Sequence, residues 1–175
     1  MFERVETNDE LRITISSELG NVGRVLDAVR EWLSDLPPRA YSRLCVVLEE
    51  LTVNAIVHGN RIRRKRLVSC RLKSFAEECV KVTVEDEGKG FDYCALDMSL
   101  PEHVGLSRNR GYALIGALSE SLEFNEQGNR VTACLRLSDE TVGNSIWAGA
   151  HLDELIAERL AESPPSPVEG GNVGT

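Results

Sequence analysis

The sequence predicts an α+β fold, a two-layer sandwich in which helices cover one face of a mostly antiparallel or mixed sheet. Several short segments alternate between apolar and polar residues, which is typical of half-buried strands. Longer segments between them carry apolar residues at helical spacing, which is typical of helices with one buried face. Their order is strand, two helices, two strands, loop, helix and two strands. This order favours helices that pack together on one side of the sheet.

The first half of the chain predicts one strand and two helices. Residues 11–17 alternate and form the strand, and residues 18–33 place their apolar side chains on one helical face. Two prolines at 37–38 separate this helix from the next, because proline removes a backbone donor from the helix interior. Residues 39–58 then predict a strongly apolar helix, which Gly59 ends.

The second half begins with a predicted hairpin and a long loop. Residues 67–75 and 79–84 alternate and are joined by a short turn, so we expect them to pair. Residues 86–110 show little regular pattern. A loop of this length in a compact domain is often a functional lid.

A third helix and a closing hairpin follow. Residues 112–122 carry apolar residues at helical spacing. Residues 122–125 and 130–137 predict two strands around a Gly-Asn turn. The regular pattern ends there.

The chain divides into one domain, an extension and a tail. We expect a compact domain over residues 8–138, which hold all of these segments. Residues 139–162 predict an amphipathic helical extension. Residues 163–175 are rich in Pro, Gly and Ser and predict a disordered tail.

Charge and cysteine usage exclude several classes of function. The formal net charge is -8 and the pI is near 5.0, so the chain gains nothing from the phosphate neutralisation that drives nucleic-acid binding. No segment approaches the roughly 20 apolar residues of a membrane span, and the first residues lack the apolar region of a secretory signal.

The five cysteines are odd in number and include no C-x-x-C pair. This pattern favours reduced thiols in a cytoplasmic protein.

The second predicted helix carries a narrow polar stripe. Glu50, Asn54 and His58 are successive i, i+4 positions and share one helical face. Apolar residues border the stripe on both sides, which indicates burial beside a polar group. Because an ionised Glu is costly to bury alone, a metal ion, a triphosphate or a reacting hydroxyl is the expected neighbour. The alternative is an ordinary helix whose polar edge meets solvent or caps a neighbouring loop.

An acidic residue and two glycines follow the second strand of the first hairpin. Glycine permits positive φ and close approach of other groups, as expected for Gly88 and Gly90 in this turn. Asp86 beside such a turn can accept a hydrogen bond from an exocyclic amine such as that of adenine. Two alternatives are a simple acidic turn and metal binding by Asp86, Glu87 and Asp92.

A third motif joins the long loop to the third helix. Gly111 lies where that helix begins, and the free N–H groups there form an anion site. Arg108 and Arg110 add positive charge suited to phosphate. The alternative is a solvated basic turn.

Together, the order and spacing of these motifs resemble those of the GHKL ATPase superfamily, and within it the anti-sigma-factor serine/threonine kinases of bacteria. Residues 50–58 are similar to the N box, and residues 86–90 to the G1 box. Residues 109–115 resemble the lid motif, and residues 124–131 the closing hairpin of this kinase branch. The resemblance covers about residues 8–137 and implies a Bergerat-type sandwich with an ATP lid.

The resemblance implies ATP and Mg²⁺ as cofactors and roles for the residues at matching positions. Asn54 would ligate Mg²⁺ through its side-chain oxygen. Glu50 would act as the general base or orient the attacking hydroxyl. Asp86 would hold the adenine amino group, while Gly88 and Gly90 would let the backbone close around the base.

The resemblance also implies a phosphate site at the lid. Gly111 and the amides near it would cradle phosphate, with Arg108 or Arg110 assisting. Family lids usually carry Gly-x-Gly, whereas this chain has Asn109 at the first glycine position. Because Asn tolerates the left-handed region better than most residues, this substitution bears on turnover more than on nucleotide binding. We expect His58 to be structural or to help orient the site.

The resemblance finally implies an ATP-dependent serine/threonine protein kinase in a partner-switching module. Such a kinase binds a sigma factor or similar effector in one state. In the other state it phosphorylates a small STAS-type antagonist, and the family commonly forms homodimers. One alternative is a nucleotide-binding module that sequesters a partner without phosphoryl transfer. The other, an ATPase coupled to conformational change, is disfavoured by the short chain.

Overall fold

The computed structural model describes residues 1–75, 79–96, 98 and 110–137, together with Glu154, Ile156, Ala157 and Ala161. The predicted extension at 139–162 and the predicted tail at 163–175 therefore lie almost wholly outside the described residues. Ile156 of the extension is buried and belongs to the main hydrophobic core.

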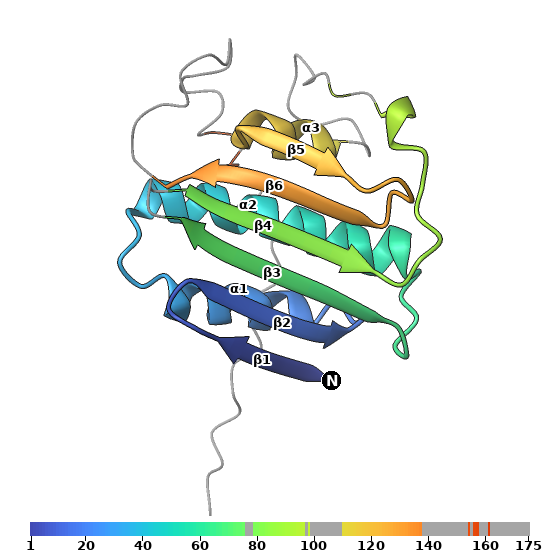
Figure 1. Cartoon of the computed structure of the whole chain (residues 1–175), viewed down its shortest axis with the longest axis horizontal. Helices are drawn as coiled ribbons and strands as arrows, with labels where there is room; N and C mark the ends of the chain where they lie inside the picture. The colour runs from blue at the N-terminus through green and yellow to red at the C-terminus, as the bar shows by residue number, and fades with distance from the viewer. Residues whose placement is uncertain are drawn as a thin grey trace, which may run out of the picture.

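Six strands of the described chain form one sheet in the order β1-β2-β3-β4-β6-β5 (Figure 1). Every neighbouring pair is antiparallel. β3 and β4 form the first predicted hairpin, and β5 and β6 form the last. The strands are β1 (Phe2–Glu6), β2 (Glu10–Ser16), β3 (Leu67–Phe75), β4 (Cys79–Asp86), β5 (Ser121–Phe124) and β6 (Arg130–Arg136).

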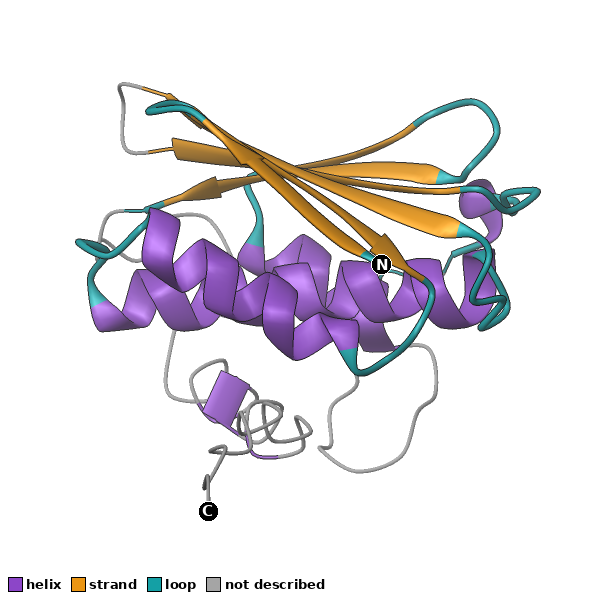
Figure 2. Cartoon of the chain, turned by 90° about the horizontal axis from the view of Figure 1, so that it is seen from below, coloured by secondary structure: helices purple, strands orange, loops and turns teal. Residues whose placement is uncertain are grey.

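Three helices lie against one face of this sheet, so the protein has two layers (Figure 2). They are α1 (Asn21–Trp32), α2 (Pro38–Asn54) and α3 (Arg110–Leu118). α2 starts at a proline, which the first helical position tolerates because its N–H would have no intrahelical partner. Within the described residues, none of the helices has the length and apolar character that a membrane crossing requires. The arrangement confirms the predicted α+β sandwich.

The core lies between the two layers and follows the two sequence periods. Leu11, Ile13 and Ile15 alternate along β2 and are fully buried, whereas Arg12 between them is exposed. Leu48 of α2 belongs to the same cluster. α2 contacts both β4 and β6, so the helix with the polar stripe lies over the centre of the sheet.

Strand β1 and two element boundaries differ from the prediction. The sequence pattern does not predict β1, because its charged residues point to both faces and its strand conformation comes from pairing with β2. The third helix ends at Leu118 rather than at residue 122, because Ser121 already pairs with Cys134 of β6. β4 continues two residues further than predicted, so Asp86 is its last residue.

The predicted α-helix over residues 39–58 is wrong in its last turn. α2 is regular up to Asn54, and Ala55–Gly59 then forms a π-helical turn. The Asn60 N–H donates to the C=O five residues earlier, at 2.8 Å. His58 lies within this wider turn and is exposed. π-helical turns of this kind are frequent at functional sites.

Candidate functional site

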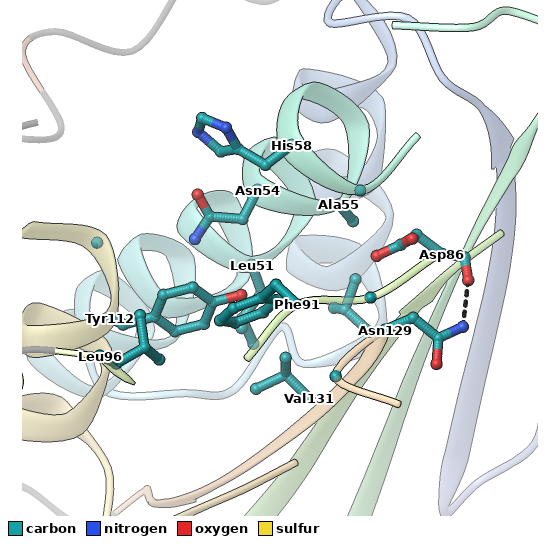
Figure 3. A pocket seen from close by; sticks show the side chains of 15 residues that line it. Leu51, Asn54, Ala55, His58, Asp86, Phe91, Leu96, Tyr112, Asn129 and Val131 are labelled. Carbon is teal, nitrogen blue, oxygen red and sulfur yellow. Dashed lines mark hydrogen bonds between the residues drawn. The ribbon is translucent and has the colours of Figure 1, made fainter. Parts of the chain in front are cut away.

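A pocket of about 300 Å³ lies between α2, α3, the end of β4 and the β5–β6 turn (Figure 3). Small-molecule sites commonly span about 300–1,000 Å³. The walls are largely apolar, and the polar groups come from several elements. The pocket is lined by Leu51, Asn54, Ala55, His58, Gly59, Val84, Asp86, Gly90, Phe91, Leu96, Gly111, Tyr112, Gly128, Asn129 and Val131.

The carboxylate of Asp86 is the acidic group of this pocket. Burial raises the pKa of this carboxyl group, whereas the Gly88 N–H, which donates to Oδ1 at 2.7 Å, and the nearby Arg66 act in the opposite direction. A partly desolvated carboxylate is a strong hydrogen-bond acceptor. It therefore suits a neutral N–H donor on a flat ligand, such as the exocyclic amine of a purine.

Two glycines make room for the Asp86 carboxylate. A Cβ atom at Gly59 would overlap this carboxylate. A Cβ atom at Gly88 would overlap both the Gly59 C=O and the carboxylate. Gly88 belongs to the loop after β4, whereas Gly59 ends the π-helical turn. Close approach of these two segments explains the absence of a side chain at both positions.

The β5–β6 turn packs directly against the loop after β4. Gly90 and Gly128 have positive φ values of 74° and 75°. A Cβ atom at Gly90 would overlap the Gln127 C=O, and one at Gly128 would overlap the Phe91 C=O. This backbone contact closes one side of the pocket.

Asn54 faces the first turn of α3. Its Nδ2 atom is buried and has no hydrogen-bond partner among the described residues. A Cβ atom at Gly111 would lie 2.6 Å from Glu50 Oε2 and 3.3 Å from Asn54 Nδ2. The Glu50 carboxylate, the Asn54 amide and the start of α3 therefore meet at one point.

This meeting point fits a magnesium ion that is bound to phosphate. Rotation of the Asn54 amide presents its oxygen in place of its nitrogen, and Mg²⁺ takes oxygen ligands with only one or two from the protein. Free N–H groups at a helix start bind phosphate. Within the described residues, no group of three or more His, Cys, Asp or Glu side chains could hold a metal ion. Asn54 would supply one oxygen ligand, and phosphate and water would contribute others.

Four aromatic rings from three segments gather beside the pocket. Phe91 and Tyr112 have ring centroids 5.6 Å apart, and Tyr93 stacks on Phe124 at 4.9 Å. Burial, with a smaller contribution from the charge of Asp86, raises the pKa of Tyr112 to about 12, so its hydroxyl is neutral at physiological pH. The cluster provides a flat apolar wall, which suits the face of a planar ligand.

The structure brings most of the predicted site residues together. Four of them line the pocket: Asn54, Asp86, Gly90 and Gly111. Glu50 and Gly88 lie directly against these residues. Arg108 lies outside the described residues. Arg110 is the first residue of α3, and its side chain also lies outside the described part.

The contributions of Gly59, Phe91 and Asn129 to the pocket are not predicted from the sequence. The helix pattern explains Gly59 as a helix stop, although a glycine next to a polar stripe also indicates close approach of another segment. Phe91 directly follows the second glycine of the Asp86 turn. Asn129 belongs to a predicted hairpin turn, and nothing local indicates that this turn lies beside β4.

The fold and the pocket define an α+β domain with a small-molecule pocket between its two layers. The histidine kinase-like ATPase domain family matches residues 15–135, more than half of the chain, and the chain belongs to this family. Membership in this GHKL-type family indicates nucleotide binding, generally of ATP with Mg²⁺.

Among solved structures, the chain is similar to the histidine kinase domain of the blue-light activated histidine kinase from Erythrobacter litoralis EL346. The identity is 24% and the TM-score is 0.46, over 68% of this chain and 65% of that chain. The chain therefore spans slightly less than two thirds of that structure's length. A comparison with curated proteins finds no match.

Proposed function

We propose that the chain is an ATP-dependent serine/threonine protein kinase that acts in the cytoplasm as an anti-sigma factor or a similar partner-switching regulator. In one state it binds a sigma factor or other effector. In the other it phosphorylates a serine of a small STAS-type antagonist, and the added charge weakens that interface. The family resemblance also supports a homodimer, which the mass of the protein in solution would test.

One observation supports phosphoryl transfer above all, namely the meeting of Glu50, Asn54 and the start of α3. Transfer to a hydroxyl needs a group that accepts or orients its proton, an oxygen ligand for Mg²⁺ and donors for the phosphate oxygens. The Glu50 carboxylate, the Asn54 amide and the N–H groups near Gly111 have these three chemistries. The first two groups lie beside the start of α3, because a Cβ atom at Gly111 would be 2.6 Å from Glu50 Oε2 and 3.3 Å from Asn54 Nδ2.

Each residue would then have one task. Asp86 accepts a hydrogen bond from the adenine amine, and Gly88 and Gly90 allow the backbone to close on the base. The start of α3 at Gly111 binds phosphate oxygens, assisted by the neighbouring arginines Arg108 or Arg110. When bound, Mg²⁺ offsets negative charge on the phosphates.

Glu50 would act on the attacking serine. It accepts the hydroxyl proton, or orients the hydroxyl, as the serine oxygen bonds to the γ-phosphorus and the bond from that phosphorus to the bridging oxygen breaks. ADP leaves with the electron pair of the broken bond. The product is a phosphoserine on the antagonist.

The test uses γ-phosphate-labelled ATP, Mg²⁺ and a STAS-type protein encoded in the same genome. Wild type should label a serine of that protein. Glu50→Gln should label it at least about 100-fold more slowly. Calorimetry should give both proteins the same affinity for ATP. Equal labelling by the two proteins would rule out the assigned role of Glu50. A wild type that binds ATP and the partner without transferring phosphate would favour the sequestering module.

A further inference from the structure

The peptide group between Asp86 and Glu87 is held at both ends by asparagine side chains. Its C=O accepts a hydrogen bond from Asn129 Nδ2 at 2.8 Å, and its N–H donates to Asn60 Oδ1 at 3.0 Å. Asn60 follows the π-helical turn, and Asn129 lies in the β5–β6 turn. Two segments that are distant in the sequence thus fix one peptide plane.

Asn129 also holds the other side of the Asp86 backbone. The Asp86 N–H donates to the Asn129 C=O at 3.0 Å. Asn129 is itself fixed by Asn125, whose Nδ2 donates to Asn129 Oδ1 at 2.8 Å and whose Oδ1 accepts from the Asn129 N–H at 3.1 Å. Both peptide groups that flank the Asp86 Cα atom are therefore held, and so is the direction in which its side chain leaves the backbone.

The Asn60 side chain is also fixed by hydrogen bonds. It is 0% exposed, and its Nδ2 donates to Ser17 Oγ and to the Leu67 C=O, both at 2.8 Å. These two bonds leave the amide oxygen directed at the Glu87 N–H. The Glu87 carboxylate in turn accepts from the Leu67 N–H at 2.8 Å. Asn60 does not line the pocket, so any effect it has on a ligand passes through the groups that it holds.

We propose that Asn60 and Asn129 are positioning residues that set the preference of the pocket for a purine with an exocyclic amine. They hold the Asp86 backbone so that its carboxylate meets that amine at hydrogen-bonding distance. The inference rests on the adenine-nucleotide binding in the proposed function. In this view, the preference for a purine with an amino group depends on the hydrogen bonds that hold the Asp86 backbone as well as on the Asp86 carboxylate.

The test compares two nucleotides that differ only in the amine. Affinities for Mg²⁺-ATP and for Mg²⁺-purine riboside triphosphate, which lacks the amino group, are measured by calorimetry. Wild type should prefer ATP by about tenfold or more, as expected for one hydrogen bond to a charged acceptor. Asn60→Ala and Asn129→Ala should each reduce this preference to roughly threefold or less, mainly by weakening ATP binding. A general loss of stability would weaken both nucleotides alike and leave their ratio unchanged.

Thr132→Val is the matched control. Thr132 also links β6 to β4, through a 3.1 Å hydroxyl contact with Thr83, on the sheet face opposite the pocket residue Val131. The control should keep the wild-type preference. If Asn129→Ala does not fold, the ratio of the two nucleotide affinities is measured for Asn129→Asp instead. This variant keeps the size of the side chain and removes the N–H donor.

Two results would overturn the inference. One is folded Asn60 and Asn129 variants that keep the wild-type preference for ATP, or that lose both affinities by the same factor. The other is a wild type that binds the two nucleotides equally, since Asp86 would then not recognise the amine. A wild type that binds neither nucleotide would refute the proposed function as well, which separates the two failures.

Discussion

Gly59 and Asp86 lie so close together that no methyl group fits between the Gly59 Cα atom and the Asp86 carboxylate. Gly59 ends the π-helical turn after α2, and Asp86 ends β4. The contact therefore joins the helix layer to the sheet at the point where the pocket is acidic. It makes the position of the carboxylate sensitive to a single methyl group.

We expect Gly59→Ala to displace the Asp86 carboxylate. The free energy of unfolding should fall by about 1–3 kcal/mol, the usual cost of forcing an extra methyl group into a packed region. ATP affinity should fall by roughly tenfold or more, because a hydrogen bond to a charged group is lost. Urea denaturation and calorimetry measure the two effects.

Gly20→Ala is the control for this change. Gly20 has φ near -61°, and no atom of the described residues lies within 4 Å of the position that its Cβ atom would take. Alanine there should leave ATP affinity unchanged and leave stability equal or raised by about 0.4–1 kcal/mol. Similar losses at Gly20 and Gly59 would contradict the role of the Asp86 contact.

Alanine should destabilise the fold much more at Asn60 than at Asn54. Asn60 forms three hydrogen bonds through its side chain, so Asn60→Ala should cost about 2–4 kcal/mol of folding free energy. Asn54 Nδ2 is buried without a partner among the described residues. Asn54→Ala should therefore change stability by less than about 1 kcal/mol.

The functional effect at Asn54 should be large despite this small change in stability. We expect its Mg²⁺-dependent ATP affinity to fall by about tenfold or more, because an oxygen ligand of the metal is lost. ATP affinity measured in EDTA should stay near the wild-type value. If Asn54→Ala destabilises the fold as much as Asn60→Ala, the Asn54 amide contributes to stability, and its proposed role as a ligand of the metal is contradicted.

The raised pKa of Asp86 predicts a pH-dependent stability. Its unfolded value is near 3.8, and the folded value is higher because of burial. Between these values the native state binds more protons than the unfolded state, so this group stabilises the fold at low pH and the stabilisation is lost as pH rises through the folded pKa. Asp86→Asn does not titrate. Its free energy of unfolding, measured in urea from pH 4 to 7, should therefore rise relative to wild type with increasing pH, and the opposite trend would exclude this explanation.

Gly111→Ala tests the contact between α3 and Glu50. The new Cβ atom would lie 2.6 Å from Glu50 Oε2, so it should displace the carboxylate. If Glu50 acts on the attacking hydroxyl as proposed, the phosphoryl-transfer rate should fall by about tenfold or more, and ATP affinity should fall less. Single-turnover kinetics separates the two quantities.

Gly116→Ala is the control in the same helix. Among the described residues, its Cβ atom would meet the flexible end of Met98, at 2.9 Å. Alanine in a helix interior is favoured over glycine by about 0.5–1 kcal/mol. The control should transfer phosphate at the wild-type rate, and a loss equal to that of Gly111→Ala would indicate a general effect on α3.

Local sequence patterns predict the parts of the site that lie on one element. The helical period places Glu50 and Asn54 on the same face of α2, and both are half-buried. The acidic residue and glycines after a strand predict the turn that holds Asp86 and Gly88. The same local signals predict the sandwich, because the strand and helix periods differ clearly.

Contacts between distant segments explain what the sequence does not predict. A glycine beside the polar stripe indicates close approach of another segment, but it does not identify Asp86 as the neighbour of Gly59. Nothing near Asn129 indicates that its amide bonds the Asp86 C=O. The π-helical turn that exposes His58 lies in a segment whose apolar pattern is that of a regular helix. β1 has no clear period of its own and depends on pairing with β2.

The Asp86–Glu87 peptide group, which Asn60 and Asn129 both hold, also determines when during synthesis the pocket can form. β6 pairs with β4, and the turn that precedes β6 supplies Asn129, so a chain that ends before this turn cannot form the hydrogen bonds that hold the Asp86 backbone. A nascent or truncated protein that stops before β6 is expected to have no nucleotide affinity, however well its earlier helices form. Ligand present during synthesis would act on the finished domain alone, by shifting the final folding equilibrium through mass action.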